Sequence, residues 1–368
     1  MSRVALRFAA AGLGAVLLGL LAACEPPVTV IEAAALPPLP EPAANNAVAR
    51  AGPPAAPVIV SLMGLAAGRQ WSDVHARSFL LEPDAAAWTR LPDVPGPGGR
   101  LAGTAVGLAD AVILFGGYTV AEDGSEISVE RVQRLDLACR TWTELAPMPL
   151  PVDDSVSLPY GDRYVYLVSG WHHSGNVNLV QVYDRVEDRW FQATPWPGPA
   201  VFGHAGGIVG DTMAICDGVG IESRVDGPRR FVAIAACYIG VIDGDDPARI
   251  DWRRLPYHGG LPLYRMAATG SVTRGQIVFA GGSDNPYNYA GIGYDGEPSA
   301  PSGRVFAWDL AAGVWQELGA LPQPSMDHRG LLETPAGFVI VGGMHAEQTV
   351  TDAVTRLELP PPLSAGID

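Results

Sequence analysis

A tryptophan recurs through this sequence at intervals of 54, 48, 62 and 63 residues, at Trp88, Trp142, Trp190, Trp252 and Trp315. An acidic residue stands six positions before each of them, at Glu82, Asp136, Asp184, Asp246 and Asp309. Upstream in each unit, a run of β-forming residues ends in Gly, as in Phe115-Gly116-Gly117 and Val341-Gly342-Gly343. Independent markers that keep one rhythm indicate an internal repeat, in which each copy is one supersecondary unit stacked on its neighbours.

Each repeat unit is consistent with four short antiparallel strands. The second strand, such as residues 276–280, ends at a Gly pair, where a side chain would clash with nearby backbone. The third strand delivers its Asp into a tight turn, as at Asp309, where the carboxylate can cap its own backbone. The fourth strand carries the Trp, which is large enough to fill the wedge between neighbouring units. A single four-stranded sheet cannot bury both faces, so such units pack radially into a closed ring.

This pattern of Gly pair, Asp turn and Trp resembles the kelch repeat, and the resemblance covers nearly all of residues 58–359. Counting second strands gives six units. The resemblance therefore implies an all-β fold, a six-bladed kelch-type β-propeller of four-stranded antiparallel blades. It assigns structural roles to the Gly pairs and the Trp residues, and it leaves function to the loops.

The sixth unit ends after its third strand, residues 354–359, and lacks a strand that carries Trp. Residues 28–32, followed by Leu36-Pro37, read like residues 314–318 followed by Leu321-Pro322, and would supply the missing strand. Residues 47–51 would then form the first inner strand. The alternative is that residues 24–57 are an Ala/Pro-rich tether. The predicted organisation is a signal at 1–23, this tether or closing segment at 24–57, the propeller at 58–359 and a tail at 360–368.

The N-terminus resembles the signal of bacterial lipoproteins. Arg3 and Arg7 precede an apolar run, residues 8–20, that is too short to span a bilayer but suits a secretory signal. The run leads to Leu21-Ala22-Ala23-Cys24, which resembles a lipobox and implies cleavage before Cys24 and acylation of that residue. We therefore expect a protein lipid-anchored to a bacterial membrane, on the periplasmic side of the outer membrane or exposed on it.

The net charge of −15 makes nucleic acid an unsuitable partner, since binding phosphates requires clustered Lys and Arg. The same charge opposes direct adhesion to anionic lipid, so the lipid chains on Cys24 would have to provide the membrane contact.

In a four-stranded blade, the loops that enter first strands and leave second strands lie on one face, around the mouth of the central channel. We predict that this face binds the ligand, a glycan or a protein, through ten residues: Trp171, His172, His173, His204, Arg265, Tyr289, Asp327, His328, Arg329 and His345. The ionisable groups of Asp327, His328, Arg329 and Arg265 are the acid–base candidates. For the two arginines, the alternative is a structural role in loop packing.

Neither a metal nor another cofactor is expected. His172, His204, His328 and His345 would be the available ligands, but no helical or Cys-type spacing supports a metal site. Cys216 and Cys237 fall near the loop ends of adjacent antiparallel strands in the fourth unit and are predicted to form a disulfide in an oxidising compartment.

Two functions remain open. The first is a non-catalytic module that binds a ligand, glycan or protein at the channel mouth. The second is a sugar-modifying enzyme similar to bacterial N-acetylneuraminate epimerase, a sialic acid mutarotase, with which Arg265, Arg329 and Asp327 are compatible in type and place. Guanidinium groups would suit an acidic sugar. A copper radical oxidase similar to galactose oxidase is disfavoured because the Cys residues lie elsewhere.

Overall fold

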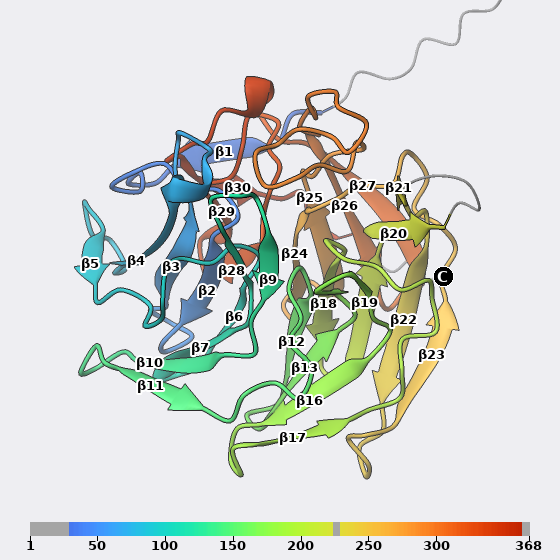
Figure 1. The fold of residues 1–368 in the computed structure, drawn as a ribbon. Coiled ribbons are helices and arrows are strands. Elements are labelled where there is room, and N and C mark those ends of the chain that lie inside the picture. Colours follow the sequence, from blue (N-terminus) through green and yellow to red (C-terminus); the bar gives the residue numbers. More distant parts are fainter. Residues whose placement is uncertain (1–28, 224–228, 363–368) are drawn as a thin grey trace, which may run out of the picture.

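The computed structural model describes residues 29–223 and 229–362. Six four-stranded antiparallel sheets surround a central axis (Figure 1), and the two helical turns within these ranges are the short 3-10 helices η1 (Trp71–Asp73) and η2 (Ala346–Gln348). The all-β, six-bladed prediction is confirmed. No helix in the described ranges is long and apolar enough to cross a membrane.

The blades follow the chain in order. Blade one comprises β2 (Ala47–Ala51), β3 (Val58–Leu65), β4 (Val74–Leu81) and β5 (Thr89–Leu91). Blade two comprises β6 (Thr104–Gly107), β7 (Ala111–Phe115), β10 (Val132–Asp136) and β11 (Trp142–Leu145). Blade three comprises β12 (Val156–Tyr160), β13 (Tyr164–Val168), β16 (Val180–Asp184) and β17 (Arg189–Gln192). Blade four comprises β18 (Ala205–Val209), β19 (Thr212–Cys216), β22 (Cys237–Ile242) and β23 (Ile250–Arg254).

Blade five comprises β24 (Ala267–Ser271), β25 (Gln276–Ala280), β26 (Arg304–Asp309) and β27 (Val314–Ala320). Blade six comprises β28 (Leu332–Thr334), β29 (Gly337–Val341), β30 (Val354–Glu358) and the N-terminal strand β1 (Glu32–Ala35). Three two-stranded hairpins are inserted between second and third strands: β8 (Tyr118–Val120) with β9 (Glu126–Ser128), β14 (Trp171–His172) with β15 (Gly175–Asn176), and β20 (Val219–Glu222) with β21 (Arg230–Ala233).

The five repeated Trp residues link each of blades one to five to the blade before it. In every case the indole Nε1–H donates a hydrogen bond to a backbone carbonyl that follows the fourth strand of the preceding blade. The five donor–acceptor pairs are Trp88–Pro37, Trp142–Pro92, Trp190–Ala146, Trp252–Thr194 and Trp315–Pro256, at 2.7 to 3.3 Å. A purely apolar side chain could not make this bond, which explains why the repeat carries Trp and not merely a bulky apolar residue.

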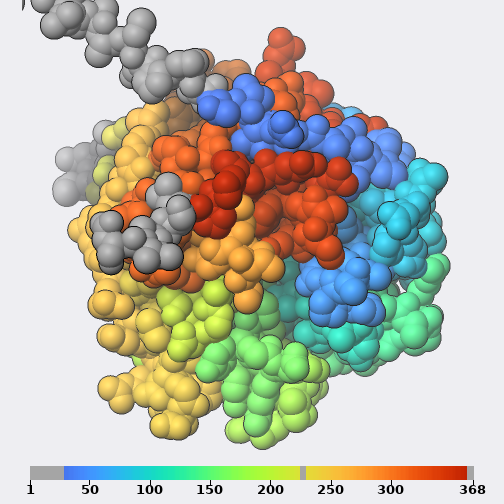
Figure 2. All heavy atoms as spheres, turned by 180° about the vertical axis from the view of Figure 1, so that it is seen from behind, coloured from blue at the N-terminus to red at the C-terminus, as the bar shows by residue number. Residues whose placement is uncertain are grey.

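The N-terminal segment closes the ring. Strand β1 pairs antiparallel with β30, with Glu32 opposite Glu358 and Ala35 opposite Thr355. From behind, the blue N-terminal residues lie directly against the red C-terminal ones (Figure 2). The segment that pairs with β30 is 32–35 and not the predicted 28–32, because the residues just before β1 bond elsewhere: the Ile31 N–H donates to Ala320 of blade five at 2.9 Å. Of the two alternatives for this region, the structure has the closing strand, so the propeller extends N-terminally beyond Val58 through β2 and β1.

Candidate functional site

Six residues at the entrances to the first strands form a ring around the channel mouth. All have left-handed backbone, with φ between 51° and 69°: Asn45, Ala102, Asp154, Gly203, Arg265 and Asp327. Backbone hydrogen bonds join successive members: Arg265 donates to Gly203 (2.8 Å), Gly203 to Asp154 (2.8 Å) and Asp154 to Ala102 (3.1 Å). The left-handed turn aims each loop at its neighbour, so the mouth is built as one continuous rim.

A buried ion network lies across this rim. Arg265 donates to both carboxylate oxygens of Asp154, from Nη2 at 2.6 Å and Nε at 3.1 Å, and from Nη1 to Asp327 at 2.8 Å. Arg329 also pairs with Asp154, and its Nε donates to the Asn45 side-chain oxygen at 2.8 Å. The four charged side chains are at most 4% exposed. Two cations therefore face two anions, with no net charge.

The electrostatics follow from this pairing. Burial alone would raise the pKa of Asp154, but the charges of Arg265 and Arg329 hold it below its ordinary value. The pKa of Asp327 is raised, chiefly by burial. Both guanidinium groups pair with side chains of the protein, Arg265 with Asp154 and Asp327 and Arg329 with Asp154, which is compatible with the structural role given as the alternative for the two arginines.

Three of the predicted residues line the channel below the network. The channel encloses about 270 Å³ between the inner strands, and His204, His328 and Arg329 are part of its wall. His204 Nε2 lies 2.8 Å from the Val168 carbonyl oxygen, and His328 Nε2 lies 2.9 Å from the Ser325 hydroxyl. Desolvation by burial lowers the pKa of His204 to about 4 and that of His328 to about 3. Both imidazoles are thus neutral at pH 7 and do not reach the outer face.

The remaining predicted residues are dispersed around the mouth. His172 is half-buried with Nδ1 2.7 Å from the Pro151 carbonyl, and the exposed His173 packs on its ring at 4.1 Å between centroids. Tyr289 is half-buried against the apolar cluster under the loops. His345 borders a separate small cavity at the edge of blade six, and burial lowers its pKa. Of the four histidines considered as metal ligands, His204 and His328 thus share the channel wall, whereas His172 and His345 lie elsewhere.

A pocket of about 90 Å³ opens on the outer side of the ion network. Its walls are Tyr118, Glu126, Asp153, Asp154, Trp171, Phe202, Phe231, Arg265 and Tyr294. Of the ten predicted binding residues, it brings together Trp171 and Arg265. Arg265 therefore forms a floor shared by the network and the pocket.

Aromatic rings make up one side of this pocket. The Trp171 ring lies 5.3 Å from that of Phe202, and Phe202 lies 5.9 Å from Phe231, both edge to face. Phe231 in turn stacks on Tyr294 at 4.1 Å. These edge-to-face and stacked arrangements are the favourable ones for aromatic quadrupoles, so the wall is preformed.

Carboxyl groups make up the other side. Asp153 is buried, and its Oδ2 accepts a hydrogen bond of 2.6 Å from the Ser128 hydroxyl. Burial, followed by the neighbouring charge of Asp154, raises the pKa of Asp153. Glu126 lies at the rim on β9; desolvation of its carboxyl over the pocket raises its pKa to about 7, although the residue as a whole is exposed. The pocket thus combines aromatic rings with two carboxyls, of Glu126 and Asp153, whose pKa values are raised.

Sequence reasoning missed Glu126, Phe231 and Tyr294 as site residues. The first two lie on the inserted hairpins and the third in the long loop between β25 and β26. None of these segments belongs to the repeat, so no periodic signal marked them. The only sequence signal for these residues was the unusual length of the segments between second and third strands.

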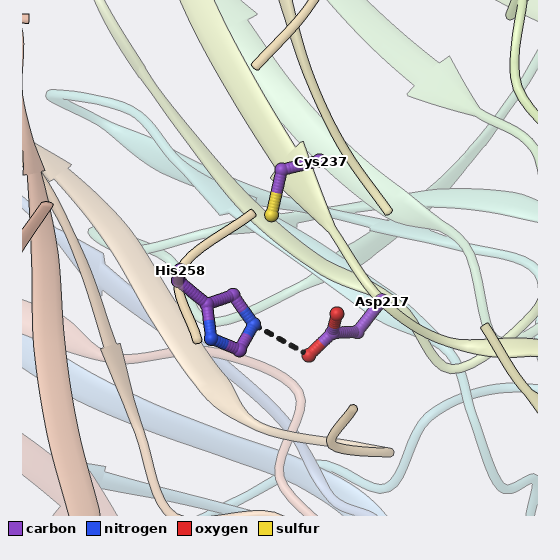
Figure 3. A group of neighbouring side chains, drawn as sticks. All are labelled: Asp217, Cys237 and His258. Carbon is purple, nitrogen blue, oxygen red and sulfur yellow. Dashed lines mark hydrogen bonds and ion pairs between the residues drawn. The ribbon is translucent and has the colours of Figure 1, made fainter. Parts of the chain in front are cut away.

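A second group of polar residues lies between blades four and five (Figure 3). His258 Nε2 is 3.0 Å from the Asp217 carboxylate, and Cys237 is adjacent. Asp217 also accepts hydrogen bonds from the Tyr257 hydroxyl and the Leu263 N–H. The Cys237 sulfur is bonded to Cys216, the partner predicted from the sequence. With the thiol consumed and the carboxylate saturated, this group joins loops and does not present a metal site.

The fold is a six-bladed β-propeller, and the loops at its channel mouth form the candidate pocket. No protein-family model matches the chain. Over 108 residues it is 32% identical to Kelch-like protein 15 of Gallus gallus. This aligned stretch is 29% of this chain and 22% of that protein. Over 213 residues it is 27% identical to Kelch-like protein terF of Aspergillus terreus, covering 56% and 43% of the two chains. The solved structure of YjhT superposes with a TM-score of 0.68 at 18% identity, covering 90% of this chain and 98% of that one.

The chain is a kelch-repeat β-propeller. It spans less than half the length of the curated relatives that it matches. The similarity to YjhT, at 18% identity, concerns the fold alone.

Proposed function

We propose that this propeller is a binding module that takes its ligand at the channel-mouth face, in the pocket between Trp171 and Glu126. The observation that carries the proposal is the convergence of preformed aromatic walls and carboxyls above a rigid ion network. Concave apolar sites with a few convergent polar groups are the usual place for ligands. A rigid floor also lets loops of different blades act as one surface.

A protein partner suits this face best. Three large side chains, Trp71 (41% exposed), Ile127 (54%) and Tyr294 (42%), lie on loops between second and third strands and hence on the face of the pocket. The pocket itself, at about 90 Å³, is well below the ~300–1,000 Å³ of sites that enclose a whole small molecule. It therefore suits one protruding group of a larger partner. A glycan partner would instead lay a sugar ring on Tyr294 or Trp171.

The test is a binding screen of the soluble form, starting at Glu25, against glycans and candidate partner proteins. We expect Trp171→Ala and Phe231→Ala to abolish capture of whatever binds. Val186→Ala, an exposed apolar residue in the β16–β17 turn on the opposite face, is the matched control and should bind like the parent. Unaltered binding by both pocket variants would move the site elsewhere.

A second candidate is a sugar-modifying enzyme, such as a sialic acid mutarotase. It is supported by Glu126, whose pKa of about 7 suits a general acid or base at neutral pH, beside the differently placed carboxyl of Asp153. The neutralised Arg265 is unfavourable for an acidic sugar. An anomer-exchange assay decides: catalysis by the parent that Glu126→Gln slows at least tenfold supports this function, and no acceleration by the parent excludes it.

We also propose that the protein is lipid-anchored at Cys24, which lies outside the described residues. Glu32, the first residue of β1, stands eight positions after Cys24, and a chain spans at most ~3.3–3.6 Å per residue. The propeller would thus be held within ~30 Å of the membrane surface. Mass spectrometry of detergent-extracted protein should find an acylated Cys24 at the N-terminus, and an intact segment 1–23 would overturn the proposal.

A further inference from the structure

We propose that the pocket recognises a methylated ammonium group. This inference rests on the proposed binding function and names the chemistry of the group that enters the pocket. Four features carry it: the aromatic wall, the charge of the lining, the behaviour of an internal cation and the size of the cavity.

The aromatic wall brings several rings to one small space. Trp171, Phe202, Phe231 and Tyr294 line the pocket together, and Tyr118 completes the set. Ring faces carry negative potential and attract cations, with Trp the strongest of the four types. Methylated ammonium groups are weakly hydrated and are held in aromatic cages of this kind. A cage without carboxyls would also suit a neutral apolar group, so the charge of the lining is the next consideration.

The lining is acidic. It contains the carboxyls of Glu126, Asp153 and Asp154 and a single cation, Arg265, which is already engaged with Asp154 and Asp327. Burial raises the pKa of Asp153 well above its ordinary value, so the charge that the protein leaves unneutralised at this site comes from Glu126 as it ionises. The chain as a whole has a net charge of −15 and so favours the approach of cations. An anionic ligand would meet opposition from both the local and the global field.

The protein already places a cation on this wall. The Arg229 guanidinium lies 5.7 Å from the centroid of the Trp171 ring and donates to the Ser174 carbonyl. The ring of Trp171 therefore already lies against a cation of the protein itself. Arg229 itself is not part of the pocket lining.

The cavity size selects a compact group. About 90 Å³ is several times the ~10–15 Å³ that one water requires and far less than a small-molecule site offers. A trimethylammonium group on a narrow stem is the corresponding shape. The stem would leave the pocket past the exposed Tyr294, toward the surface on which we place the partner.

The experiment is calorimetric titration of the soluble propeller, starting at Glu25, with choline and with its neutral isostere 3,3-dimethylbutan-1-ol. The two probes have the same shape and differ by the charge. We expect choline to bind at least tenfold more tightly. Equal binding of both probes, or binding of neither, overturns the inference.

Variants of the lining sharpen this test. Trp171→Leu keeps an apolar side chain but removes the ring face, and should lower the affinity for choline at least tenfold. Glu126→Gln keeps the shape and removes a charge. Glu122→Gln, an exposed carboxylate in the same hairpin and outside the lining, is the matched control and should leave choline binding unchanged. Thermal melting of each variant separates lost binding from lost folding.

Binding should also depend on pH. The titratable and charged groups that face Glu126 are Asp153, Asp154, Arg265, Tyr118 and Tyr294. With a pKa of about 7, Glu126 is ~10% ionised at pH 6 and ~90% ionised at pH 8. We therefore expect choline to bind about tenfold more tightly at pH 8 than at pH 6. The Glu126→Gln variant should lose most of this difference. A parent without pH dependence would contradict the role of Glu126.

The same titrations distinguish this inference from the function on which it rests. If a glycan or a partner protein binds and Trp171→Ala abolishes that binding while choline neither binds nor competes, the binding module stands and the ammonium assignment fails. If choline binds, a peptide bearing trimethyl-lysine is compared with it. Tighter binding of the peptide identifies a protein source, and tighter binding of choline a small-molecule source.

Discussion

Arg265 and Asp154 face each other across the channel mouth through two parallel hydrogen bonds, of 2.6 and 3.1 Å, although 111 residues separate them in the chain. The pair joins the entrance of blade five to that of blade three, and the contact of Arg265 with Asp327 adds blade six. The mouth is thereby fastened by side chains as well as by the backbone rim. This arrangement positions the floor of the pocket.

Replacing Arg265 should destabilise the propeller strongly. Arg265→Met leaves the buried carboxylates of Asp154 and Asp327 short of a partner, and breaking one side of a buried ion pair costs about 3–5 kcal/mol. Denaturant unfolding of the parent and the variant measures this loss. Arg253→Met, at an exposed position on β23, should change stability by less than about 0.5 kcal/mol. A small loss for Arg265→Met would mean that the network adds little to stability.

The blades could be predicted because their markers are local and repeated. The interblade bond from each Trp indole requires the same residue at the same place in each unit, so it appears in the sequence as a rhythm. Ring closure was predictable only in outline. The segment 28–32 resembles a fourth strand, but the bond from Ile31 to Ala320 of blade five moves the pairing to residues 32–35.

The site was harder to predict than the fold, because no local sequence pattern shows which polar side chains form hydrogen bonds with one another. Topology alone placed Arg265, Asp327 and Arg329 at the mouth. Their mutual pairing depends on loops with left-handed backbone at Asp154, Arg265 and Asp327, which are not Gly and gave no turn signal. Exposed and buried positions therefore look alike in the sequence, which does not show that Arg265 and Arg329 pair with Asp154.

The closing strand should be important for stability. Ile31 is 4% exposed within the core between blades five and six, while its neighbour Val30 is 60% exposed. Truncating a buried Ile to Ala costs about 2–5 kcal/mol, because apolar contacts are lost and a cavity remains. We expect Ile31→Ala to lower the free energy of unfolding by that amount and Val30→Ala to leave it nearly unchanged. Equal effects of the two would contradict a packed closing segment.

The disulfide should contribute measurably to stability. Cys216 and Cys237 are 21 residues apart, and closing a loop of that size in the unfolded chain is worth about 3 kcal/mol in the chain-entropy description. Cys216→Ala combined with Cys237→Ala should lose this amount. Dithiothreitol should lower the unfolding midpoint of the parent toward that of the double variant and leave the variant unaffected. Cys139→Ala, at an exposed free thiol, controls for general thiol effects.

Acid should destabilise the propeller between pH 6.5 and about 4 through its buried histidines. Burial lowers the pKa of His75 to about 3, of His204 to about 4 and of His328 to about 3, against 6.5 for an ordinary histidine. In this window the unfolded chain binds protons that the folded protein refuses, so the free energy of unfolding falls as pH falls. Each histidine contributes up to about 1.4 kcal/mol per pH unit.

The comparison of the parent with His204→Gln isolates one of these histidines. Gln keeps a donor for the Val168 carbonyl and cannot take up a proton in the window. Glu126 and Asp153 act in the opposite direction, since their raised pKa values favour folding at lower pH, but they are common to both proteins and cancel in the difference. We expect the parent to lose more stability than His204→Gln between pH 6.5 and 5, by up to about 2 kcal/mol. Parallel pH profiles would show that His204 is protonated as readily in the folded protein as in the unfolded chain.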